Sequence, residues 1–401
     1  MPTEVDTLLG RLHIEELADL CQDLTSIPSP NPPGDTTAIA EHAMALLSEA
    51  GASPAIHNPR GNAASVVCVI EGRSPDRAPS IVLNGHLDTF PVAETGWTEP
   101  AFPARRTPTR IYGPGATDMR AGLTAIIAVA RLAISRRESL NGRLVLALAA
   151  DEETGGRWGT EWLLDNVEAV RGDICIVTDQ NGIETVSIAE KGFAWLRIEA
   201  AGVGGHGAYA SSSGAYRVLL PALARILELE TDPLWRGVAG CTVNVGQVEG
   251  GVGPNLAPST AFGYIDVRFP PGHTSEEVIA RVRELVDQVA SGVDIEVVRA
   301  FDSLSSPVDD RHIQRFMNCA HNRVGEQVPA VTRAGTSDAR FFRRAGIPTV
   351  LYGPAPHNMG TGDDYLEISD LVTVTATLAD FVGASCIDPA NPSSFDLPTE
   401  S

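Results

Sequence analysis

The N-terminal third of the chain alternates between two spacings of apolar residues. In HIEELADLCQDLTSI, residues 13–27, apolar positions recur every three or four residues, which predicts a helix with one buried face. Short, almost continuously apolar runs separate such segments, and these are typical of strands covered on both faces. The expected helices are 13–27, 36–52, 121–135 and 159–167, and the expected strands are 64–72, 80–90, 143–151 and 173–179. The pattern predicts an α/β domain with a mostly parallel sheet flanked by helices.

From about residue 190 the order of elements changes. Strand, helix, two strands, helix and strand follow one another up to about residue 303, which predicts an α+β unit with an antiparallel sheet. The α/β pattern then resumes with a helix at 312–324, a strand at 347–353 and a helix at 369–384. We therefore expect one domain made of residues 1–189 and 304–401, with residues 190–303 inserted as a second domain.

Composition narrows the class of protein. A length of 401 residues suits two cores. The formal net charge of −21 argues against nucleic acid as a partner, because phosphates would be repelled. No apolar run reaches the roughly 18 residues of a membrane span, and the acidic N-terminus is unlike a secretory signal. Six scattered cysteines without a C-x-x-C pair predict reduced, mostly buried thiols. We expect a cytoplasmic protein without a membrane partner.

Polar residues cluster just after the apolar runs, where ligands bind in such sheets. They are His86, Asp88, Asp118, Glu152, Glu153 and Asp179. Imidazole and carboxylates without thiolates suit zinc, manganese or cobalt in a hydrolase. His86 and Asp88 share one strand face, so His86 could bind a metal while Asp88 accepts its other ring proton. Taken alone, a strand-end HLD is more often structural and three successive acids are more often a solvated turn, so the prediction rests on their co-occurrence.

A series of ordered sequence blocks resembles a known family. The blocks are GHLDT, GPGATDMRAG, ADEETGG, KGFAWLRI, GGHGAYASSSGAYRVL, NVGQVEGGVGPNLAP, DVRFPPG and AGTSDARFFRRAGIP. They resemble the co-catalytic zinc amidohydrolases and exopeptidases that include succinyl-diaminopimelate desuccinylase, acetylornithine deacetylase, carboxypeptidase G and aminoacylase. The resemblance covers nearly the whole chain. It implies a zinc exopeptidase-like catalytic domain with an inserted lid and dimerisation domain.

The resemblance also implies a site with two divalent metal ions, with zinc preferred and cobalt or manganese as alternatives. Asp118 would bridge both ions, His86 and Asp179 would complete one shell, and Glu153 with a late histidine would complete the other. Glu152 would be the general base that takes a proton from water and gives it to the leaving amine. Gly155 and Gly156 would let the adjacent acids diverge.

Further residues match family positions that contact substrate. His206 matches a lid histidine that reaches the active site of the partner subunit in dimeric members, so a homodimer through the lid is expected. Four others match positions that grip substrate: Asn255, Arg268, Gly335 and Thr336. By itself His206 is more often a solvated loop residue. For Arg268, a surface salt bridge is as good an explanation as carboxylate binding.

The last metal ligand departs from the family pattern. There a histidine is followed by two residues and then by an acid or amide and a glutamate, whereas His357 lies six residues before Asp363, and Gly360 takes the usual histidine position. Either the loop is longer and His357 still binds the metal, which we favour, or the shell is rearranged. A rearranged site would use one metal only, or water or Asp364 as ligand.

These observations predict a dinuclear metal-dependent hydrolase that cleaves the amide bond of a small carboxylate-bearing substrate such as an N-acyl amino acid. An alternative within the same fold is hydrolysis of another C–N bond, by an aryl amine deaminase or a carbamoyl-amide hydrolase. A third hypothesis is a catalytically inactive relative that only binds a metabolite. The presence of all the expected metal ligands and of the general base Glu152 argues against it.

Overall fold

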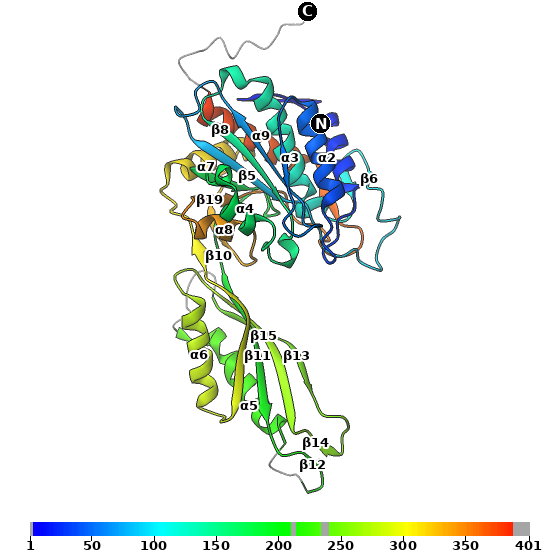
Figure 1. Ribbon diagram of the computed structural model, residues 1–401, viewed down its shortest axis with the longest axis vertical. Helices are drawn as coiled ribbons and strands as arrows, with labels where there is room; N and C mark the ends of the chain where they lie inside the picture. The colour runs from blue at the N-terminus through cyan, green and yellow to red at the C-terminus, as the bar shows by residue number, and fades with distance from the viewer. Residues whose placement is uncertain (1–2, 210–213, 234–239, 388–401) are drawn as a thin grey trace, which may run out of the picture. The chain divides into compact units, whose positions relative to one another are not determined.

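The computed structural model describes residues 3–209, 214–233 and 240–387 (Figure 1). The chain divides into two units. The first is Met1–Ile188, Ser306–Val331 and Ser337–Ser401, and the second is Ala189–Ser305 with Thr332–Thr336. The sequence-based boundaries, 189/190 and 303/304, lie close to these divisions, whereas the short segment 332–336 was expected in the first domain. Residues 388–401 of the expected first domain lie outside the described part.

A mixed sheet forms the centre of the first unit. Four neighbouring strands, β19, β9, β5 and β8, run parallel, and antiparallel strands continue the sheet at both sides. The order is β17-β10-β19-β9-β5-β8-β4-β3, with β18 also paired to β10; β17 and the last two residues of β10 and of β18 belong to the second unit. The strands are β3 (Ala55–His57), β4 (Ser65–Glu71), β5 (Ser80–His86), β8 (Arg143–Ala149), β9 (Ile174–Val177), β10 (Val186–Glu190), β17 (Leu304–Ser305), β18 (Ala330–Arg333) and β19 (Thr349–Leu351). The predicted fold class is confirmed, with the parallel pairing confined to the centre.

Helices cover both faces of this sheet. They are α1 (Ile14–Thr25), α2 (Thr37–Glu49), α3 (Ala121–Ser135), α4 (Thr160–Asn166), α7 (Arg311–Val324), α8 (Ala339–Arg344) and α9 (Ile368–Cys386). Ile81 and Leu83 of β5 join one core cluster with residues of α2, α3, α7 and α9. On the opposite side of the same strand, the Asn84 amide donates to Thr160 Oγ1 of α4 at 3.2 Å. This alternation explains why the strand is apolar at almost every position.

Contrary to the expectation from the sequence, one helix, α9, is long and apolar enough, by length and composition, to cross a membrane. Most of it is buried inside the first unit, where it packs against α3 and α7. These are the surroundings of a core helix.

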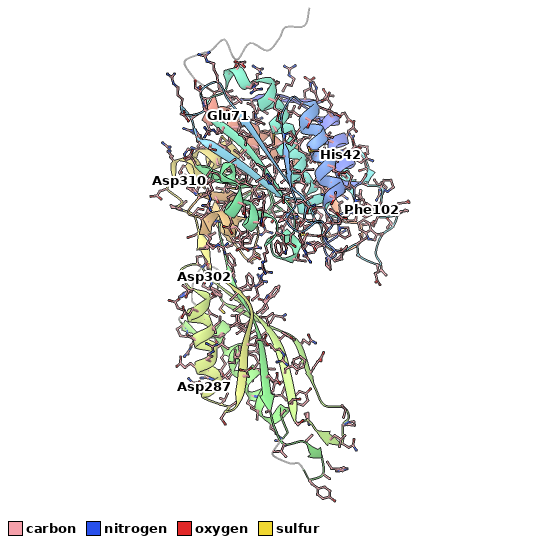
Figure 2. The ribbon with its side chains drawn as sticks, in the orientation of Figure 1. His42, Glu71, Phe102, Asp287, Asp302 and Asp310 are labelled. Atoms are coloured by element: carbon pink, nitrogen blue, oxygen red, sulfur yellow. The ribbon has the colours of Figure 1, made fainter. Side chains whose placement is uncertain are left out.

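At the start of α7, Asp310 caps the helix by accepting hydrogen bonds at Oδ1 from the backbone N–H groups of His312 and Ile313 (Figure 2).

Two small sheets were not expected from the sequence because their strands are too short for a periodic pattern. One pairs β1 (Glu4–Thr7) with β2 (Gly10–His13), and the other orders β20 (Tyr365–Glu367), β7 (Arg110–Tyr112) and β6 (Arg105–Arg106). In the second sheet, Tyr365 pairs with Tyr112. This pairing brings the segment after His357 beside the chain that leads to Asp118.

The second unit is a four-stranded antiparallel sheet with two helices. Its order is β13-β15-β11-β16, and the elements are β11 (Gly192–Ala201), α5 (Tyr216–Leu227), β13 (Thr242–Gly250), β15 (Thr260–Phe269), α6 (Ser275–Asp287) and β16 (Val293–Phe301). Leu196 and Ile198 of β11 are buried in one cluster with residues of α5 and α6. Two short strands, β12 (Gly205–His206) and β14 (Leu256–Ala257), pair with each other. The predicted antiparallel α+β unit is present.

All six cysteines are free and buried, as predicted. Five lie in the first unit, and Cys241 lies in the second. Burial raises the pKa of the Cys21 and Cys241 thiols to about 11.

Candidate metal centre

Three predicted ligands meet at the carboxyl ends of the central strands. His86 ends β5, Asp118 lies in the irregular turn before α3, and Glu153 follows β8. One ligand atom from each residue lies within 4.8 Å of the others, and His86 Nε2 is 2.9 Å from Asp118 Oδ1. Because β5 and β8 are parallel neighbours with His86 opposite Ala149, their ends place these side chains together.

The electrostatics of this cluster fit a divalent cation. Glu153 Oε1 is buried without a hydrogen-bond partner. Burial, and next the negative charge of Asp118, raise the pKa of Glu153 to about 10. A buried carboxylate beside a second carboxylate is unfavourable unless a positive charge compensates it. One imidazole with two carboxylates is a donor set that zinc, manganese or cobalt accepts, so His86, Asp118 and Glu153 could hold such an ion.

His86 is oriented by the residue two positions after it. Its Nδ1 lies 3.0 Å from the backbone oxygen of Asp88 and 3.5 Å from the Asp88 carboxylate. Burial opposes protonation, but hydrogen bonds to Asp118 and Asp88 raise the pKa of His86 well above its usual value. The near acceptor of the ring proton is therefore the carbonyl of Asp88, whereas the sequence suggested its carboxylate.

The Asp88 carboxylate instead holds the turn that carries the two glutamates. Its Oδ1 accepts the backbone N–H of Glu152 at 3.1 Å, and its Oδ2 accepts that of Glu153 at 3.0 Å. Asp151 adopts a left-handed conformation with φ of 67°, and Gly155 and Gly156 also have positive φ. The backbone is therefore sharply turned on both sides of the two adjacent acids, at the glycine pair that the sequence singled out.

Glu152 lies beside the cluster and faces a cation. Its Oε1 is 3.4 Å from Arg340 Nη1; the Arg340 side chain is buried, and the Glu152 side chain is 13% exposed. Burial raises the pKa of Glu152 to about 8, although the charges of Arg340 and His86 act in the opposite direction. Arg340 was missed by sequence reasoning. It lies inside the AGTSDARFFRRAGIP block, but neither spacing nor composition pointed to a contact with Glu152 in the turn after β8.

Two other predicted ligands lie outside this cluster. Among the residues that the structure describes, neither Asp179 nor His357 places its ligand atoms in the group within 4.8 Å. Asp179 is buried after β9, and its Oδ1 accepts the Gln180 N–H at 2.6 Å. The His357 ring stacks on Tyr365 with centroids 4.6 Å apart and planes 4° apart.

Asp364, considered as a substitute ligand, is buried next to the cluster. Its Oδ2 accepts the Gly115 N–H at 3.0 Å, and its Oδ1 is buried without a partner. Burial raises the pKa of Asp364 to about 7, the Gly115 hydrogen bond lowers it, and the charge of Asp118 raises it further. Asp364 thus resembles Glu153 in carrying a buried carboxylate oxygen without a hydrogen-bond partner, which its position in the sequence did not indicate.

The remaining predicted residues belong to the second unit. His206 forms β12, and the next residue, Gly207, donates its N–H to the Asn255 carbonyl at 2.7 Å, so His206 and Asn255 lie close together. Arg268 on β15 forms a bidentate ion pair with Asp266, Nε to Oδ1 at 2.9 Å and Nη2 to Oδ2 at 3.0 Å. Arg268 therefore forms a salt bridge in this structure, which is one of the two explanations considered from the sequence. Gly335 and Thr336 lie in the loop before α8.

Known proteins resemble the chain in sequence and in fold. A succinyl-diaminopimelate desuccinylase of Paracoccus denitrificans is 31% identical over 70% of this chain and 76% of its own length. An N-formyl-4-amino-5-aminomethyl-2-methylpyrimidine deformylase of Halalkalibacterium halodurans is 25% identical over 93% and 95%. A Staphylococcus aureus tripeptidase superposes with a TM-score of 0.78 at 17% identity, over 93% of this chain and 99% of that one.

A second solved structure is described as a dinuclear metal-binding peptidase. This Bacillus subtilis protein of family M20 superposes with a TM-score of 0.67 at 17% identity, covering 92% of this chain and 98% of its own. The family model for peptidase family M20/M25/M40 matches residues 82–384, which include every predicted site residue. The chain therefore belongs to peptidase family M20/M25/M40, and it is an amidohydrolase of that family.

Proposed function

We propose that this protein is a dinuclear metal-dependent deacylase that removes an acyl group from the nitrogen of a small carboxylate-bearing molecule, such as an N-acyl amino acid. One observation carries the proposal: His86, Asp118 and Glu153 converge within 4.8 Å beside the buried carboxylate of Glu152. The relatives named for desuccinylation and deformylation both release an acyl group from nitrogen. Those names favour an acyl amide over an aryl amine or carbamoyl substrate.

We assign the ligands as the sequence blocks suggest. Asp118 would bridge two ions, with His86 and Asp179 on one and Glu153 and His357 on the other. Zinc is the proposed metal because imidazole and carboxylate donors suit it. When bound, the two ions would acidify a water molecule and polarise the amide carbonyl. The buried Oε1 of Glu153, which has no hydrogen-bond partner, supports the second site, and the histidine proposed for that site, His357, lies outside the group of ligand atoms within 4.8 Å.

Glu152 is the proposed general base. It would take a proton from water at Oε1 or Oε2 and deliver that proton to the leaving amine. Its raised pKa, about 8, suits a group that must both accept and donate a proton near neutral pH. Arg340 at 3.4 Å from Oε1 would hold the carboxylate in one orientation. Asp88 would position the turn through the two backbone amides it accepts.

The second unit is proposed as a lid and dimerisation domain. His206 would donate to the carbonyl oxygen as charge develops there, and Asn255, Arg268, Gly335 and Thr336 would contact the substrate. A homodimer through this unit is supported by exposed apolar residues around β12, β13 and β14: Val203, Tyr209, Val248, Val252 and Leu256. We further propose that the protein works in the cytoplasm, where its six free thiols would stay reduced.

A substrate screen tests the proposal. Purified protein stripped of metal is loaded with zinc, cobalt or manganese and offered N-succinyl, N-formyl and N-acetyl amino acids, dipeptides and aryl amides. Release of free amine from an acyl amino acid, only with metal, is the expected result. Release from aryl amines or carbamoyl compounds alone would replace the substrate class, and no turnover with any metal would overturn the proposal. The acid Glu276, at the exposed start of α6, supplies a control variant, Glu276→Gln, that should retain full activity.

A further inference from the structure

Asn31 lies in the loop between α1 and α2, next to the metal centre. Its backbone N–H donates to the Thr89 carbonyl at 2.9 Å, which fixes the loop to the chain after β5. The side chain is 5% exposed. Its amide nitrogen Nδ2 lies 2.8 Å from Asp88 Oδ2, 3.0 Å from Thr154 Oγ1 and 3.4 Å from Asp151 Oδ1. One amide group therefore faces two carboxylates and a hydroxyl.

These contacts fix which end of the Asn31 amide points at the carboxylates. Ionised carboxylates accept hydrogen bonds only, so the NH₂ group and not the oxygen must face Asp88 and Asp151. The oxygen lies on the side of Gly34, where an added Cβ would be 2.8 Å from Asn31 Oδ1. The absence of a side chain at Gly34 leaves room for this orientation.

The partners of Asn31 are the groups that shape the catalytic turn. Asp88 is fully buried and binds the backbone N–H groups of Glu152 and Glu153. Asp151 accepts the Thr154 hydroxyl at Oδ1 and the Trp158 N–H at Oδ2, which closes the other side of the turn. Asn31 is the side chain that connects these two carboxylates, and its donor hydrogens lie where their negative charges would otherwise face each other.

We propose that Asn31 is a positioning residue for amide hydrolysis: its carboxamide joins Asp88 to the Asp151–Thr154 turn and so fixes the backbone from which Glu152 and Glu153 project. The expected loss of activity rests on the proposed function, in which Glu152 and Glu153 take part in catalysis. The side-chain hydrogen bonds of Asn31 go to Asp88, Asp151 and Thr154, and not to the ligand atoms or to Glu152. Its effect passes through Asp88 and through the turn.

The test compares three variants with one control. Asn31→Ala removes the bridge, Asn31→Asp keeps the size but adds a third carboxylate, and Thr154→Val removes only one partner. Asn62→Ala is the control, because Asn62 also donates to this loop, to the Pro33 carbonyl at 3.3 Å, but contacts neither Asp88 nor the turn. Outer partners of metal ligands typically change affinity or activity by about 10–100-fold when mutated.

We expect kcat to fall by about 10–100-fold in Asn31→Ala, further in Asn31→Asp and less in Thr154→Val. KM should stay within about twofold, because no substrate contact is lost. Zinc affinity, measured by chelator competition, should weaken in the same order, and amide hydrogen exchange at Glu152 and Glu153 should accelerate. Asn62→Ala should match the parent in every measurement.

Two measurements do not depend on catalysis, so the inference and the proposed function can fail separately. If the parent hydrolyses no amide, exchange at Glu152 and Glu153 and zinc affinity still test Asn31. Unchanged exchange and zinc affinity in folded Asn31→Asp would overturn the positioning role, and so would a change in KM alone. If every variant except Asn62→Ala failed to fold, Asn31 would be a folding residue, and the proposal would be wrong.

Discussion

Arg340 Nη1 lies 3.4 Å from Glu152 Oε1, although the two residues are 188 positions apart in the chain. The Arg340 side chain is buried and that of Glu152 is only 13% exposed, so water screens the charge on Arg340 weakly. The Arg340 guanidinium also donates to the Ser337 carbonyl at 2.7 Å, which fixes it to the start of α8. A rigid cation beside a buried acid restricts the orientations of that acid.

Glu152→Gln should reduce turnover by at least about 10²–10⁴-fold, because an amide cannot accept the proton that a carboxylate accepts. Metal content should remain near that of the parent, since Glu152 lies outside the ligand cluster. Turnover and elemental analysis on the same preparation check this. Glu153→Gln is the matched comparison and should lose metal. A Glu152→Gln protein that lost metal as well would show that the two roles had been exchanged.

The stability of the metal-free protein should fall as pH rises above about 5. Folded Glu152, Glu153 and Asp364 have pKa values of about 8, 10 and 7, whereas carboxyls in an unfolded chain titrate near 4. Between these values the folded state binds more protons than the unfolded state, so a rise in pH favours unfolding.

Bound cations replace those protons, so the rise in Tm on adding zinc should be larger at pH 8 than at pH 6. Thermal unfolding with and without a chelator measures this difference. Glu153→Gln should raise the Tm of the metal-free protein at pH 8 and diminish the effect of zinc. An equal zinc shift at both pH values would contradict the expected sign.

His357 and Asp364 offer a direct comparison for the second metal shell. If His357 binds metal as proposed, His357→Ala should lose about one ion per chain, and Asp364→Asn should retain it. If Asp364 is the ligand, the two results should be exchanged. Elemental analysis after gel filtration decides between them. Loss in neither variant would remove both residues from the ligand set.

Gly159→Ala should destabilise the first unit by about 1–3 kcal/mol. A Cβ there would lie 1.7 Å from the Ala150 carbonyl oxygen, so the turn after β8 and the start of α4 would have to separate. Chemical denaturation measures the loss. Gly246→Ala is the control, because its nearest neighbour, Asn244 Nδ2, would be 3.5 Å away. A cost for Gly159→Ala no larger than for the control would show that the close approach is relaxed at little cost.

Sequence reasoning reached the central strands and the residues at their ends for a physical reason. Strands buried on both faces leave continuous apolar runs, as at 80–86 and 143–149, and the polar residues that follow stand out. The contacts of Asn31 and Arg340 leave no such pattern, because their partners are 57 and 188 residues away. Likewise, the sequence placed Asp88 on the same strand face as His86, whereas β5 ends at His86, and nothing in the sequence indicated the two amides that reach the Asp88 carboxylate. The stacking of His357 on Tyr365 depends on β20 pairing with β7, and strands of three residues carry no readable period.

The rate at which the six buried thiols are alkylated can report local opening of the fold. A thiol with a pKa near 11 hardly reacts at neutral pH until the chain around it opens to solvent. Cys241 is the single cysteine of the second unit, so the alkylation rate at that position reports the opening of the second unit. The alkylation rates of the other five cysteines report the opening of the first unit. Mass spectrometry of a labelling series would thus separate the local stabilities of the two units without any substitution in the chain.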